Sequence, residues 1–134
     1  MGTWPLVRFL HVAAAATWLG MQVALFLLVP ALRRMLPAER VREVVRAAGI
    51  RLAVVAAVAL PTLAVTGVAL GRHEPAAAEH PEVVHFKQAA LVAVAAVLLG
   101  HGLVPGRRAR IAASVLMLVL TLAAVYAGAW LAAE

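Results

Sequence analysis

Four long runs without a charged side chain constrain this sequence more than any other feature. They lie between Arg8 and Arg33, Arg51 and Arg72, Lys87 and Arg107, and Arg110 and Glu134. Each run comes close to, or exceeds, the length of about 20 apolar residues that a helix needs to cross the hydrocarbon core of a bilayer. A spanning segment must also satisfy its backbone hydrogen bonds internally. The sequence therefore predicts an all-α integral membrane protein, a bundle of four transmembrane helices.

The composition supports this class and a single domain. The chain has 134 residues, of which 65% are hydrophobic and 13% are charged. A soluble domain of this size has no way to bury so much apolar surface. We expect one domain over 1–134, with helices at roughly 6–32, 50–71, 84–104 and 110–132. The chain contains no cysteine, which excludes disulfides, thiolate metal sites and iron–sulfur clusters.

The basic residues are distributed unevenly between the two sides of the predicted bundle. Nine arginines fall in the linkers after the first and third runs, whereas the opposite side holds Arg8, Arg72 and Lys87 together with most of the acidic residues. Cytoplasmic loops are enriched in Lys and Arg. The distribution predicts both termini outside, in the inner or plasma membrane of the cell, with the arginines near anionic lipid. No aromatic residues interleave with the arginines, so the net charge of +6 does not indicate a nucleic-acid partner.

The two long linkers differ in pattern. The segment 37–51, PAERVREVVRAAGIR, predicts a short helix that lies at the interface or extends a neighbouring helix, with Val41, Val44 and Val45 on one face. The segment 71–84, GRHEPAAAEHPEVV, has two prolines and no periodicity, and it predicts a loop.

The first run carries a polar stripe. At about 100° per residue, His11, Trp18 and Gln22 share one helix face, with Ala14 and Ala15 between them. Small residues allow a partner helix or a flat ligand to approach closely. We expect this face to look toward the core of the bundle.

A second histidine is predicted at a similar depth. His85 opens the third run on the same outer side as His11, with Gln88 one turn later. Two imidazoles facing each other across a helix bundle are a common way to hold a b-type haem, and they also suit a copper site. Lys87 is about 200° around the helix from His85. Its ammonium either extends to the headgroups or bends toward an anionic group at the core edge.

The remaining histidines are weaker candidates for a cofactor or metal site. His101 lies about 24 Å further along the helix axis than His85, so it cannot join the outer site. Ring stacking or an ordinary hydrogen bond explains it better than a second haem or a proton relay. His73 and His80 lie in the outer linker, where their spacing matches no metal template. We expect them to be solvated.

Three stretches of the sequence resemble the CopD-like copper-resistance membrane family. The opening LHVAAAATWLGMQVALFLLVPALRR has that family's Leu-His pair, Trp-x-Gly and Pro-Ala-Leu exit into basic residues. RLAVVAAVALPTLAVTGVAL is similar to its second helix, and HFKQAALVAVAAVLLGHGLVPGRRAR to its third. The resemblance implies copper transport or resistance through the histidines. The scarcity of clustered Met, and the absence of Cys, disfavour passage of Cu(I).

The His…Trp-x-Gly and His-x-Lys pattern of this chain is also similar to that of the HemJ-type protoporphyrinogen oxidases, which are four-helix proteins that bind haem b. That resemblance implies that His11 and His85 are associated with haem and that Lys87 is linked to activity. The chain departs from those enzymes after Trp18, where it has GMQVALFLLVP.

The leading hypothesis is an outward-facing metal centre, a b-type haem held by His11 and His85 for electron transfer or redox chemistry. Trp18 and Gln22 would line the pocket, and Lys87 would stand at its rim. The alternatives are copper handling by the same histidines and a small non-catalytic subunit of a larger membrane complex. Besides the lipid bilayer, the expected partner is a membrane redox protein or a second copy of the chain.

Overall fold

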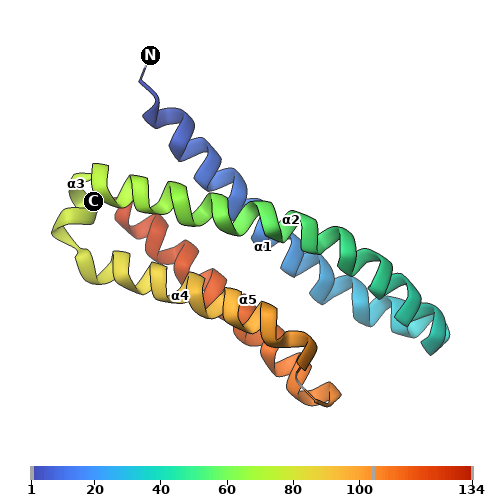
Figure 1. Cartoon of the computed structure of the whole chain (residues 1–134). Coiled ribbons are helices and arrows are strands. Elements are labelled where there is room, and N and C mark those ends of the chain that lie inside the picture. Colours follow the sequence, from blue (N-terminus) through green and yellow to red (C-terminus); the bar gives the residue numbers. More distant parts are fainter. Residues whose placement is uncertain (1, 104, 134) are drawn as a thin grey trace.

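The structure, a computed structural model, describes residues 2–103 and 105–133 and contains four long helices (Figure 1). The elements in chain order are α1 (Trp4–Met35), α2 (Ala38–His73), the short α3 (Pro75–Glu79), α4 (Pro81–Gly100), the 3₁₀ turn η1 (His101–Leu103) and α5 (Arg107–Leu131). The prediction of an all-α, four-helix membrane protein is confirmed, because each long helix is long and apolar enough to cross a membrane. The predicted end of the third helix, Val104, lies outside the described residues, as does Glu134 of the predicted outer side.

Proline and glycine mark the breaks between helices. Pro37 separates α1 from α2, and prolines lie in the first turns of α3 and α4, where their missing N–H group has no helical partner to lose. Gly106, immediately before α5, has φ = 84°, a left-handed conformation that glycine adopts without steric cost. These residues turn the chain sharply without interrupting a membrane-spanning segment.

The structure decides one linker prediction and corrects the other. The segment 37–51, predicted as a short helix that lies at the interface or extends a neighbouring helix, extends the second transmembrane helix, so that α2 begins at Ala38 and ends at His73. Arg, Glu, Val and Ala all continue a helix readily, and no proline interrupts the segment. The linker predicted as a loop, 71–84, contains α3 between Glu74 and His80, because its PAAAE stretch starts with proline and continues with alanine.

The helices are arranged as two hairpins. α1 packs extensively against α2, and α4 packs extensively against α5, whereas the contacts between the hairpins are fewer. Figure 1 shows the two hairpins diverging away from α3, with the start of α1 and the end of α5 toward the α3 end. We call this the terminal end, and we call the opposite end, with the Leu36–Pro37 turn and η1, the basic end.

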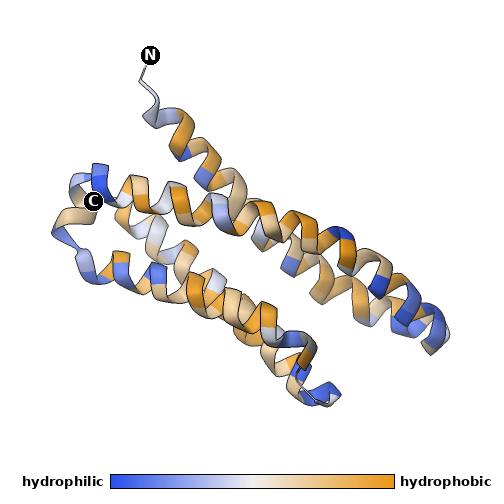
Figure 2. Ribbon diagram, in the orientation of Figure 1, coloured by the Kyte–Doolittle hydropathy of each residue, from blue (hydrophilic) through white to orange (hydrophobic). Residues whose placement is uncertain are grey.

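The shared core is small and lies between the hairpins. Trp18 is only 3% exposed and packs with Ala56, Ala59 and Val94. The alanines let the α1 and α2 backbones approach closely. Most large aliphatic side chains elsewhere are exposed. Figure 2 shows hydrophobic residues along the lengths of the helices and hydrophilic ones near their ends. This pattern suits an outer surface in contact with lipid.

Candidate functional site

His11 is held between the two helices of the first hairpin. Its half-buried ring lies against α2, with Nδ1 2.8 Å from the hydroxyl oxygen of Thr66. Gly67 makes room for the ring, because a Cβ atom at that position would lie 3.2 Å from His11 Cε1. The position and orientation of the imidazole are therefore set by two successive residues of α2.

The hydroxyl of Thr66 determines which nitrogen of His11 is protonated. Thr66 donates its only proton to the carbonyl of Thr62, one turn earlier in α2. It can therefore only accept from His11, and Nδ1 must carry the proton. In a neutral imidazole this leaves the lone pair on Nε2. A metal-ligating histidine usually binds the metal through one ring nitrogen and donates the N–H of the other to a nearby acceptor, which fixes the orientation of the ring.

Trp18 and Gln22 meet a second threonine, on α5. The Trp18 indole N–H donates to Thr121 Oγ1 at 3.2 Å, and the Gln22 amide donates to the same oxygen at 2.8 Å. Thr121 donates in turn to the carbonyl of Met117 at 2.8 Å. The structure thus joins two of the predicted pocket residues through one buried hydroxyl, and it links α1 to α5.

One acceptor atom of this hydrogen-bond network has no donor among the described residues. Among the residues that the structure describes, the buried Gln22 Oε1 has no hydrogen-bond donor within reach. Buried polar atoms normally have a partner. Gln22 therefore retains acceptor capacity on the polar face of α1.

Lys87 points inward. It is half-buried on α4, and a Cβ atom at Gly128 of α5 would lie 3.2 Å from its Nζ atom. The ammonium is also close enough to His11 and Glu74 for their charges to interact. Of the two orientations open to the sequence, the structure shows the one directed toward the core edge.

An ion pair connects the ends of α1 and α2 beside this site. The Arg8 guanidinium lies 2.6 Å from a carboxylate oxygen of Glu74, which caps the C-terminus of α2. Arg8 is largely exposed, so the pair contributes little to stability. Its effect on the site is to place a second cation and a carboxylate near His11 and Lys87.

His85 has different surroundings from His11. Its side chain is exposed on α4, and so is that of Gln88. Because Lys87 is directed inward and positions two apart on a helix diverge by about 200°, His85 faces away from the Lys87 side. The structure therefore directs His11, Trp18, Gln22 and Lys87 toward neighbouring helices and leaves His85 exposed.

Two of the other histidines contact aromatic rings. His73 stacks on Trp4 with centroids 3.5 Å apart, and His80 meets Trp130 edge-on at 4.8 Å. The helices that flank the linker bring both rings against aromatic residues of α1 and α5. His73 is the last residue of α2 rather than part of a loop, but it is exposed as predicted, and His80 is partly buried. His101 was expected to stack on a ring or to form an ordinary hydrogen bond, and its buried Nδ1 has no hydrogen-bond partner in the described part of the chain.

The partners of the site were not evident from the sequence. Thr66, Thr121, Gly67 and Gly128 each lie within an apolar run, and a polar or glycine residue in such a run is the signal that points to them. Within residues 2–103 and 105–133, no group of three or more His, Cys, Asp or Glu side chains could share a metal ion.

Comparison with protein families, curated proteins and solved structures finds no match to this chain. The chemistry of the site therefore carries the functional argument.

Proposed function

We propose that this chain is a multi-pass protein of the cytoplasmic membrane that binds a b-type haem through His11, at the terminal end, and serves electron transfer or redox chemistry. The observation that carries the proposal is the hydrogen bond from His11 Nδ1 to Thr66, whose own proton is used on Thr62. It leaves His11 Nε2 as a lone-pair donor of fixed orientation.

A porphyrin suits a site that offers a single imidazole in a fixed orientation. The macrocycle supplies four nitrogen ligands to the iron, so the protein would need to provide only one or two more, and His11 Nε2 would be one of them. Arg8 lies one helical turn before His11 on α1, and Lys87 lies on α4 at the same end of the molecule; both are cations that suit the carboxylates of a haem. The bound haem would supply one-electron chemistry. Ligation of the same iron by His85, as the sequence predicts, would require α4 to turn, because the exposed His85 imidazole faces away from the Lys87 side.

The orientation in the membrane is part of the proposal. The arginine-rich linkers support a cytoplasmic basic end, and the terminal end would then face outward. A haem at His11 would exchange electrons with a partner on the outer side of the membrane.

The test is the absorption spectrum of the purified, haem-supplied protein, oxidised and reduced. We expect a Soret band that His11→Ala abolishes, while His101→Ala, at the basic end, retains it. His11→Gly should regain the band when imidazole is added, which separates ligation from folding. Sharp, low-spin α-bands that become high-spin in His85→Ala would show two axial histidines.

Thr66 provides a further readout. Thr66→Val has nearly the same shape but cannot accept from His11 Nδ1–H, so the bound haem should show a shifted reduction potential or a lower occupancy. A spectrum without any band, or a band unaffected by His11→Ala, would contradict the proposal. Stoichiometric copper in a colourless protein would favour the copper alternative instead.

A further inference from the structure

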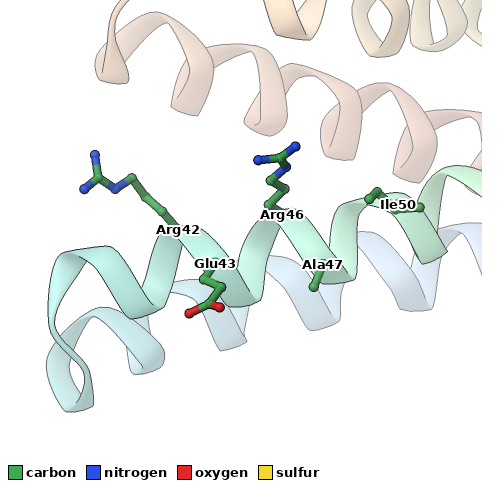
Figure 3. A pocket seen from close by; sticks show the side chains of 5 residues that line it. All are labelled: Arg42, Glu43, Arg46, Ala47 and Ile50. Atoms are coloured by element: carbon green, nitrogen blue, oxygen red, sulfur yellow. The ribbon is translucent and has the colours of Figure 1, made fainter.

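The first turns of α2 carry two arginines on one side of the helix. Arg42 and Arg46 lie one helical turn apart, and both are exposed at the basic end. Figure 3 shows their side chains projecting from the same side of α2, while Glu43 and Ala47 point the other way. With Ile50, these residues line a shallow hollow on the surface of the helix.

The charges of the two arginines are not compensated by the protein. Within residues 2–103 and 105–133, neither guanidinium has a carboxylate within ion-pair distance. The neighbouring carboxylate of Glu43 lies 3.3 Å from Arg40 instead. Two guanidinium groups one helical turn apart thus present their N–H donors to the same region.

An apolar ridge continues from the arginines toward the middle of the membrane. This ridge consists of Ile50, Val54 and Val58, which lie at successive helical turns and are 64%, 63% and 66% exposed. With a rise of about 1.5 Å per residue, Ile50 and Val58 are roughly 12 Å apart along α2. One leaflet is about half of the roughly 30 Å hydrocarbon core. The ridge therefore spans most of one leaflet.

We infer that Arg42 and Arg46 bind the phosphate of an anionic phospholipid, with an acyl chain along Ile50, Val54 and Val58. Guanidinium groups form paired, charge-assisted hydrogen bonds with phosphate oxygens. The apolar ridge distinguishes a lipid from a soluble phosphate, because only a lipid gains from covering it. This inference is independent of the proposed haem.

The test measures lipid binding to the full-length protein in detergent by native mass spectrometry. Phosphatidylglycerol competes against phosphatidylcholine with the same acyl chains. The variant is Arg42→Gln with Arg46→Gln, and the matched control is Arg107→Gln with Arg108→Gln, which removes the same charge from α5 at the same end of the molecule. Circular dichroism confirms that both remain helical.

We expect the α2 variant to lose about thirtyfold in affinity for phosphatidylglycerol, at about 1 kcal/mol per arginine, and the α5 control to lose much less. Ile50→Ser should weaken binding of the whole lipid without affecting that of glycerol phosphate. Equal losses in the two arginine variants would overturn the inference in favour of a diffuse electrostatic attraction. Glycerol phosphate that displaces the lipid at equal concentration would overturn the role of the acyl chain.

Discussion

At the terminal end, two glycines make room for two inward-facing basic side chains, His11 and Lys87. Gly67 of α2 lies under the His11 ring, and Gly128 of α5 lies under the Lys87 ammonium; in both cases an added Cβ would be 3.2 Å from the nearest side-chain atom. The two contacts differ in how easily the neighbour can move. The His11 ring is rigid and bonded to Thr66, whereas Lys87 ends in a flexible chain.

The difference leads to a prediction for alanine substitutions. Gly67→Ala should destabilise the protein by about 1–3 kcal/mol, because the ring must leave its place, and it should also weaken haem binding. Gly128→Ala should cost less than about 1 kcal/mol, since the Lys87 chain can turn aside and alanine favours the helix. Thermal unfolding in detergent measures both.

The control for this pair is Gly20→Ala on α1, where nothing lies within 4 Å of the added Cβ. We expect it to be neutral or to stabilise the protein by up to about 1 kcal/mol. A larger loss in Gly128→Ala than in Gly67→Ala would show that the lysine, rather than the histidine, is the rigid member of the site.

At the level of elements, a buried hydroxyl adds hydrogen bonds to the packing between the hairpins. Thr121 of α5 accepts hydrogen bonds from both Trp18 and Gln22 of α1, although these two helices share fewer contacts than the members of either hairpin. In lipid the association of helices depends on close packing and such hydrogen bonds, because the surrounding hydrocarbon is as apolar as the core.

Removal of this hydroxyl should loosen the two hairpins. Hydrogen bonds between membrane helices contribute about 0.6 kcal/mol on average, but a buried donor without an acceptor costs about 1–3 kcal/mol. Thr121→Val leaves two such donors, so we expect a loss of about 2 kcal/mol or more. Thermal unfolding and the fluorescence of Trp18 would report it.

Ser114→Ala is the matched control on the same helix. The Ser114 hydroxyl donates only to the carbonyl of Arg110 within α5, so its removal should cost no more than about 0.5 kcal/mol. Similar losses in the two variants would mean that Thr121 acts through its own helix and not as a link to α1.

For the whole molecule, the arginine distribution predicts which end faces the cytoplasm. The two ends offer exposed alanines for a direct comparison, Ala78 beside the terminal end and Ala38 at the basic end. The chain has no cysteine, so each can be replaced singly. A membrane-impermeant thiol reagent should label Ala78→Cys in intact cells and Ala38→Cys only after permeabilisation. The reverse labelling would invert the predicted orientation.

The sequence alone determined the class of the protein, the number of membrane-spanning helices and the places where the chain turns between them. Charged groups and unpaired backbone groups are costly in hydrocarbon, so runs without charge, ended by proline or glycine, leave few alternatives. The exact lengths were less certain, as α2 shows, because residues that suit a helix in water continue it beyond the membrane.

Only the tertiary structure decided which polar side chains meet. The sequence predicted a shared face for His11, Trp18 and Gln22, but not that Thr66 orients the first or that Thr121 binds the other two. It left Lys87 between two orientations. The physical reason is that a helix surrounded by lipid needs no strong apolar stripe to mark its buried side, so its rotation is set by small residues and hydrogen bonds that form only after the helices pack.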